Sequence, residues 1–191
     1  IAEVINTYSA EGGQMQSSEN SEFFKLAANR VLRGIIELAQ FWPRRYCNLP
    51  CVQQLIGAGG NAIVEAFENG RELMPELDEL MAAVECVLEA SDEELRDTER
   101  SDVLNGALAV LDRSGYRIGF ALRRMRNLQK RHEAGDISDE KWKKIDEAFW
   151  SQIKQEWIDR REQLESLLTK QGEFINQPED TRNSVISTLA N

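Results

Sequence analysis

Few residues of this chain have the types and the spacing that phosphate chemistry requires. The run Gly57-Ala58-Gly59-Gly60-Asn61 contains three glycines whose backbone could approach a phosphate group. A P-loop also needs a Gly-Lys-Ser/Thr sequence, because the lysine and the backbone amides together surround the phosphates. That sequence does not follow here, so the run predicts a helix terminus, and we do not expect ATP to bind by this mechanism.

Metal and nucleophile chemistry have as little support. Cys47 and Cys51 are four residues apart and could share a helix face, but a zinc site takes four ligands and His132 is the only histidine. His132 follows basic residues at the end of an expected helix, where a role at the negative end of the helix dipole is favoured over catalysis. We therefore expect no enzyme activity from this chain, and no catalytic, metal-binding or cofactor-binding residues.

Acidic residues are more informative, because they are unevenly placed. The chain has a net charge of -10, and residues 65–102 contain 14 acidic against 3 basic residues. Such a segment is either a docking surface that attracts a basic partner or a solvated helix face, and the second interpretation is favoured on general grounds. The candidate partner-binding residues are Glu72, Glu76, Asp78, Glu79, Asp92, Glu93 and Glu94.

Basic residues gather in the next segment. Residues 103–134 contain 7 basic against 2 acidic residues. Local phosphate contacts are conceivable, each adding roughly 0.9 to the salt slope on duplex DNA, although the negative net charge argues against a broad duplex-binding surface. Pairing with the acidic segment inside the domain, or plain solvation, is the favoured alternative. The possible nucleic-acid contacts are Arg117, Arg123, Arg124 and Arg126.

The elements that must position these residues are helices. Apolar residues between Phe24 and Ala39 recur at spacings of three and four, which predicts a helix capped near Asn20 or Ser21, running to about Trp42 and ended by Pro43. Residues 11–20 are expected to form a loop, and residues 1–8 are the only strand-like stretch. Further helices are expected over about 51–56 after an Asn48 cap, 61–68, 74–90, and from 179 to the end.

The most regular spacing of apolar residues follows the acidic segment, where they alternate at intervals of four and three. This spacing predicts one helix from about Asp102 to His132, with an apolar seam that would face a partner helix along its length. A turn containing Gly135 then leads to a helix over 138–171, about 50 Å long. The fold class is therefore all-α: one domain over 1–191, with a long antiparallel helical hairpin within 102–171. The seam consists of Leu104, Leu108, Leu111, Gly115, Ile118, Leu122 and Met125.

The cysteines and the apolar runs bear on the cellular compartment. Three cysteines form an odd set, which favours reduced thiols and a cytoplasmic location. No apolar run reaches the roughly 18 residues that a membrane crossing needs. The chain begins at Ile1 without an initiator Met and stops within an expected helix, which predicts a segment of a longer protein.

Two segments resemble the ends of a domain in a known family. The segment Ser18-Glu19-Asn20-Ser21-Glu22-Phe23-Phe24-Lys25-Leu26-Ala27-Ala28-Asn29-Arg30-Val31-Leu32-Arg33-Gly34-Ile35 resembles the start of the all-α domain of TraG/TraD-type coupling proteins. Near the end, Thr181-Arg182-Asn183-Ser184-Val185-Ile186-Ser187-Thr188 is similar to the segment by which that inserted domain returns to the motor. The long charged middle of the chain has no such resemblance.

The resemblance implies a parent that is a RecA-like ATPase of a type IV secretion or conjugation system, anchored at the bacterial inner membrane. It implies that this chain is a non-catalytic substrate-recognition domain that docks cargo or a relaxosome. The expected partners are a secreted protein substrate, a relaxase or an adaptor protein, possibly DNA, and the remainder of the parent ATPase, without direct membrane contact. The alternatives are a DNA-contacting module of the same motor and a structural helical protein–protein interaction domain.

Overall fold

Helices make up nearly all of the structure, which confirms the all-α prediction. The computed structural model describes residues 16–43, 46–96 and 101–190, and no strand occurs among them. The expected strand at 1–8 lies outside the described residues. The elements are α2 (Gln16–Ala39), α3 (Leu49–Gly57), α4 (Gly60–Glu68), the 3₁₀ helix η1 (Asn69–Leu73), α5 (Leu77–Glu89), α6 (Asp92–Arg96), α7 (Asp102–Ser114), α8 (Tyr116–Glu133), α9 (Asp139–Ile175) and α10 (Glu179–Ala190).

Helix α2 differs from its prediction at both ends. Residues 16–20, for which a loop was expected, are already helical in α2, and this polar stretch includes no glycine or proline that would stop the helix. The helix ends at Ala39 instead of Trp42. The amides of Phe41 and Trp42 donate to carbonyls three residues earlier, which gives tight turns before the chain reaches Pro43. The expected cap of α3 is confirmed, since Asn48 Oδ1 accepts the Cys51 amide at 3.0 Å.

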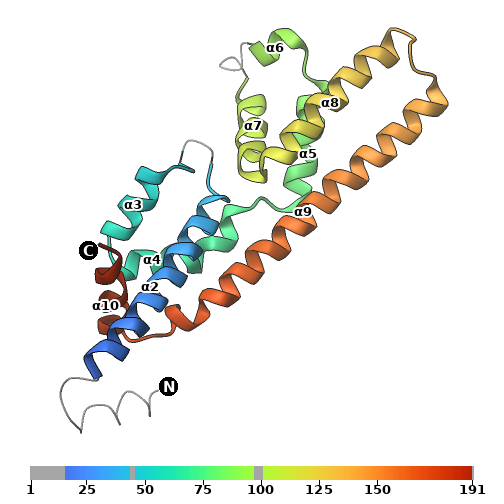
Figure 1. Ribbon diagram of the computed structural model, residues 1–191. Helices are drawn as coiled ribbons and strands as arrows, with labels where there is room; N and C mark the ends of the chain where they lie inside the picture. Colours follow the sequence, from blue (N-terminus) through green and yellow to red (C-terminus); the bar gives the residue numbers. More distant parts are fainter. Residues whose placement is uncertain (1–15, 44–45, 97–100, 191) are drawn as a thin grey trace.

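The described chain forms two lobes that share α9 (Figure 1). The first lobe consists of α2, α3, α4, η1, the second half of α9, and α10. The second lobe consists of α5, α6, α7, α8 and the first half of α9. Each lobe has its own cluster of buried apolar side chains, and Trp157 near the middle of α9 packs against both.

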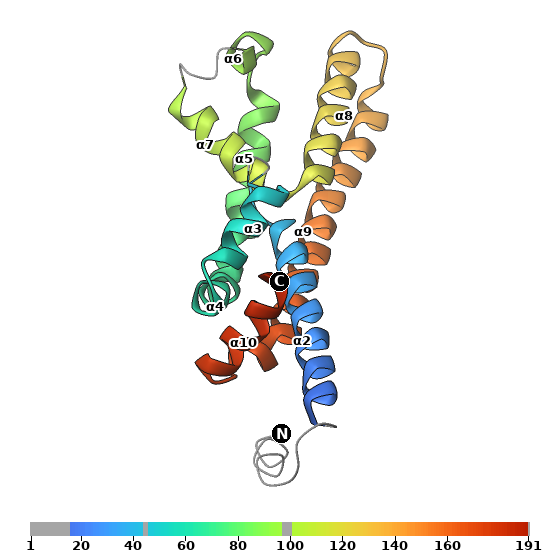
Figure 2. The same cartoon turned by 60° about the vertical axis from the view of Figure 1, so that its left-hand side comes forward.

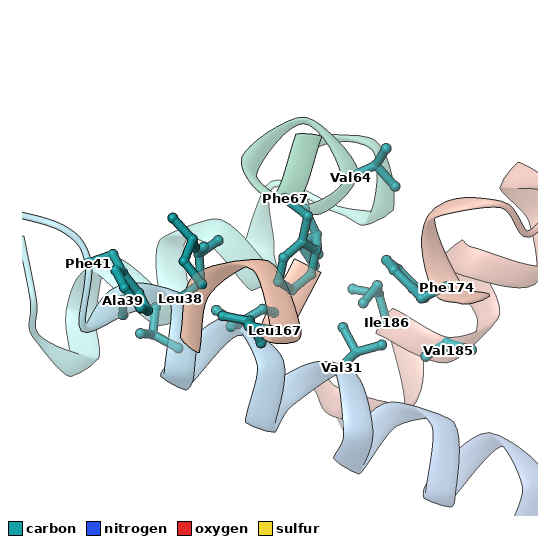
Figure 3. Close-up of a cluster of buried hydrophobic side chains, with 14 of the residues drawn as sticks. Val31, Leu38, Ala39, Phe41, Val64, Phe67, Leu167, Phe174, Val185 and Ile186 are labelled. Carbon is teal, nitrogen blue, oxygen red and sulfur yellow. The ribbon is translucent and has the colours of Figure 1, made fainter. Parts of the chain in front are cut away.

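The core of the first lobe joins segments from both ends of the chain. Figure 3 shows Val31 and Leu38 of α2, Phe67 of α4, Leu167 of α9 and Val185 of α10 gathered in one cluster. Apolar residues at helical spacing bring these side chains to the facing sides of the helices. Because α10 packs along α2, the first lobe depends on residues far apart in the sequence.

The second lobe is built from consecutive helices. Helix α5 packs mainly against α7, and α8 packs against α9 and α5. Leu80, Val84, Leu104, Ile118 and Ile153 are among its most buried side chains. The helix expected over 74–90 thus supplies one side of this core, although it begins at Leu77, after η1 and a short connection.

The predicted single helix over 102–132 is wrong, because the chain breaks at Gly115. This residue has φ of 98° and ψ of 161°, a conformation that side chains with a Cβ rarely adopt. The apolar spacing continues across the break, yet Leu104 and Leu111 lie in α7 while Ile118 and Leu122 lie in α8. The hairpin of two long helices is therefore not seen in the predicted form, since only α8 runs beside the first half of α9 (Figure 1).

Two side chains of α9 connect the lobes. Trp157 Nε1 donates to the Pro75 carbonyl at 3.0 Å. Arg160 donates to the Gln40 carbonyl at 2.7 Å, and its guanidinium lies 4.4 Å from the centroid of the Phe41 ring. Burial lowers the pKa of Arg160 from its ordinary value, although its charge survives at any physiological pH. Seen from the side in Figure 2, α9 continues past this joint from one lobe into the other.

Candidate functional site

The seven acidic candidates do not form one surface. Glu72, Glu76, Asp78 and Glu79 lie in or next to η1 and the first turn of α5, whereas Asp92 begins the group on α6. Helix α5 has 13 residues and separates the two groups by about 20 Å. A run that is continuous in sequence therefore becomes an acidic group at the joint between the lobes and another at the far end of the second lobe.

The acidic group at the joint is partly engaged in ion pairs. Glu79 Oε1 lies 3.1 Å from Arg113 of α7, and Glu76 Oε1 lies 3.8 Å from Arg161 of α9. Glu72 and Asp78 are exposed, and neither forms an ion pair with any residue that the structure describes. Asp78 and Glu79 also occupy the first turn of α5, where the helix dipole favours negative charge.

The acidic group on α6 has two structural roles: Glu94 takes part in capping the start of the helix, and Asp92 pairs with basic residues of α8. Ser91 donates from both its amide and its hydroxyl to Glu94 Oε2, and the Glu94 amide donates back to Ser91 Oγ. This reciprocal capping pattern lowers the pKa of Glu94. The pKa of Asp92 is lowered by hydrogen bonds from Lys130 and Arg126 of α8. Glu93 is exposed and forms no ion pair within the described part of the chain.

Arg126 differs from the other basic candidates, because its side chain is largely buried and hydrogen-bonded. Its guanidinium donates to the carbonyls of Val87 and Ala90 and to Asp92, and only 15% of its side chain is exposed. These carbonyls end α5, so Arg126 satisfies acceptors that would otherwise lack a partner. These contacts give Arg126 a structural role, because a side chain held in this way does not face solvent.

The remaining basic candidates lie on the outer side of α8. Arg117 has 72% of its side chain exposed and meets Glu156 of α9 at 3.5 Å. Arg123 and Arg124 are exposed and form no ion pair with the residues that the structure describes. Phe120 stands between them and Arg117, and it is 67% exposed. Three of the four predicted arginines thus share a surface with an exposed aromatic ring.

The cysteines and the histidine form no metal-binding group among the described residues. Cys47, Cys51 and Cys86 are free thiols, and within the described residues no three His, Cys, Asp or Glu side chains are grouped as a metal ion requires. His132 does not cap its own helix with its ring. Its Nε2 lies 3.0 Å from Asp139 Oδ1 and its ring stacks on Trp142, so it ties the end of α8 to the start of α9.

A cavity of about 630 Å³ lies between the end of α2 and α9. Its lining combines the carboxylates of Glu37, Asp159 and Glu162 with the Lys170 ammonium and the Phe41 ring. Ser166 also lines this cavity, and no hydrogen bond joins its hydroxyl to a base among the described residues. The described helices also include none that has both the length and the apolar character for crossing a membrane.

Sequence reasoning missed two features, the exposed ring of Phe120 and the buried side chain of Gln171. Phe120 interrupts a basic stretch, and its place on the solvent side follows only once the break at Gly115 fixes the orientation of α8. Gln171 is 4% exposed and packs against Gly34, where an added Cβ would lie 2.4 Å from the Gln171 amide nitrogen. No local signal distinguishes this glutamine from the exposed polar residues around it.

Comparison with protein-family models, with curated proteins and with solved structures gives no match for this chain.

Proposed function

We propose that this chain is a non-catalytic recognition domain that docks a protein partner on its second lobe. The proposal rests on the division of the described chain into two lobes. Both ends of the described chain, the start of α2 and the whole of α10, belong to the first lobe (Figure 1). The second lobe, built from residues 77–153 between them, is therefore free to project towards a partner.

Carboxylates at the joint between the lobes and on the second lobe support protein docking. Glu72 and Asp78 at the joint and Glu93 on α6 present carboxylates that form no ion pairs with described residues. Unpaired surface carboxylates raise the association rate of a basic partner. Together with the resemblance to coupling proteins, this supports a cargo, relaxase or adaptor as the partner, docked to a domain of a type IV secretion coupling protein.

A capture experiment tests this proposal. The full chain, immobilised, should recover a secretion substrate, relaxase or adaptor from cells that carry such a system. Charge reversal by E72K, D78K and E93K should weaken recovery, and these residues are chosen because the other four candidates hold the fold through ion pairs or capping. Recovery that is unchanged by the triple variant would rule out docking through the acidic groups.

The matched control is a variant with charge reversal elsewhere. E22K on α2, E65K on α4 and E147K on α9 alter three exposed carboxylates outside both acidic groups and change the net charge by as much as the triple variant does. This variant should recover the partner as well as the wild type does. Equal loss in both variants would attribute the effect to net charge and not to docking at the acidic groups.

A further inference from the structure

One side of α8 is almost entirely basic and faces solvent. Each residue of an α-helix advances about 100°, which places the exposed residues of α8 on one side and the buried residues Ile118, Leu122 and Met125 on the other. Helix α8 contains no acidic residue before Glu133. We call the exposed side the basic face, and it consists of Arg117, Phe120, Arg123, Arg124, Asn127, Lys130 and Arg131.

The middle of the basic face is open, whereas its ends are occupied. Arg117 is paired with Glu156 at 3.5 Å, Lys130 with Asp92, and Arg131 with Asp136 at 4.0 Å. Arg123 and Arg124 have no such pairing with any described residue. From position 120 to position 127 the helix rises about 10 Å, so the open stretch has the length of about three residues of an extended peptide.

Phe120 adds an apolar contact to this stretch. It precedes Arg123 and Arg124 by three and four residues, which places its ring beside both guanidinium groups on the helix surface. An exposed phenylalanine between arginines offers burial to an apolar side chain, and each guanidinium offers a planar fork that fits a carboxylate. The three side chains together suit a ligand that is both acidic and apolar.

We propose that the basic face of α8 binds a short acidic protein segment, with carboxylates on Arg123 and Arg124 and an apolar side chain on Phe120. The surroundings favour this ligand over nucleic acid. A phosphate backbone continues beyond the open stretch and meets Glu156 at one end and Asp92 and Asp136 at the other. The net charge of -10 repels a long polyanion further, whereas a short segment stays within the basic stretch.

Fluorescence anisotropy tests the proposal with a labelled polyglutamate peptide that is interrupted by one central phenylalanine. Titrating the full chain at low salt should raise the anisotropy, and binding should weaken roughly tenfold or more when salt reduces the Debye length to about 3 Å. The double variant R123E/R124E should weaken binding roughly tenfold, since two attractive pairs become repulsive. F120S should weaken it about threefold, because a buried apolar contact is lost.

The control variant is K141E/K143E, which makes the same change in charge at exposed positions on α9. When the variants are compared at physiological salt, where the Debye length is about 8 Å, it should alter binding by less than about threefold, because charges on another helix are then largely screened. All variants should keep the wild-type circular dichroism, because the substituted side chains are exposed.

Three outcomes would overturn the proposal. They are absence of peptide binding at low salt, equal binding by R123E/R124E and wild type, and tighter binding of a labelled oligothymidylate than of the peptide. Sedimentation of the chain alone adds a fourth, since self-association that R123E/R124E abolishes would make a second copy the occupant. The basic face is distinct from the acidic groups used above, so this inference and the proposed function can fail separately.

Discussion

Both lobes bury an apolar core, but the first joins helices far apart in the sequence and the second joins consecutive helices. In the first lobe, Arg30 of α2 meets Glu173 of α9 at 2.8 Å, and Asn61 of α4 donates to Glu179 of α10. These pairs join residues more than 100 positions apart. The second lobe packs α5 against α7 and α8 within one continuous stretch. The first lobe thus closes only when both ends of the chain are present, whereas the second is local.

This difference predicts an order of assembly. Contacts between residues close in sequence lose less chain entropy on closure than contacts between distant residues. We therefore expect the second lobe to gain protection before the first during folding, with α9 as the element that both lobes share.

The largest effect is expected from Ile35→Ala in the first lobe. Ile35 is fully buried, so truncation leaves a cavity and should lower the free energy of unfolding by about 2–5 kcal/mol. Urea denaturation followed by circular dichroism measures the loss. Hydrogen exchange should show reduced protection in α2 and α10 and a smaller change in α5 and α7, because the damaged core joins the two ends of the chain.

Ile118→Ala is the matched substitution in the second lobe. Ile118 is 2% exposed, and its truncation should reduce protection mainly in α5, α7 and α8. If both variants lose protection uniformly along the chain, the two lobes unfold as one unit and the contrast between them is lost.

Arg126→Met is expected to cost about 2–3 kcal/mol, because charged hydrogen bonds to the last carbonyls of α5 are removed while the apolar stem is kept. Thermal or urea unfolding measures this difference. Arg124→Met, on the open part of the basic face, should change stability by no more than about 0.5 kcal/mol. Equal effects at the two positions would contradict the capping role of Arg126.

Gly115→Ala should destabilise the second lobe by about 1–3 kcal/mol, since a Cβ is strained at φ of 98°. The new Cβ would also lie 3.1 Å from the Arg160 guanidinium. Gly106→Ala within α7 is the control, because an added Cβ there meets nothing within 4 Å and alanine favours the helix by up to about 1 kcal/mol. Stabilisation by both substitutions would mean that α7 and α8 can form one continuous helix.

The smallest effect concerns pH. Hydrogen bonds from Lys130 and Arg126 lower the pKa of Asp92 in the folded state, so its contribution to stability is present above its unfolded pKa, near pH 4, and is lost as pH falls through the folded pKa. Asp92→Asn should therefore reduce stability at neutral pH and make little difference in strong acid. Urea midpoints at pH 7 and pH 2 measure this, and an equal loss at both would exclude ionisation as the cause.

Sequence periodicity predicted the helices well, because each must bury one apolar side. It failed at Gly115, where the spacing of the seam is the same on both sides of the break and only the backbone conformation reveals the change of direction. It also assigned residues 16–20 to a loop, although polar residues can extend a helix without an apolar stripe. Both errors arise where helix direction or length is set by something other than apolar spacing.

The candidate surfaces were predicted less well than the helices. Glu79 and Asp92 belong to one acidic run in the sequence, yet α5 carries them to opposite ends of the second lobe. Arg126 was grouped with Arg123 and Arg124, but it turns inward to α5 because its position falls nearer the packed side of α8. Pairing across helices depends on tertiary packing, which local composition does not encode.

Helix α9 has a mechanical consequence that follows from its length and from the position of Trp157. Its 37 residues extend about 56 Å, and roughly half of that length lies on the second-lobe side of the joint. A rotation of α9 about Trp157 would therefore move its Asp139 end relative to the first lobe. A tilt of about 10° at the joint displaces the Asp139 end by about 5 Å, so a force applied at the tip reaches the first lobe as a torque.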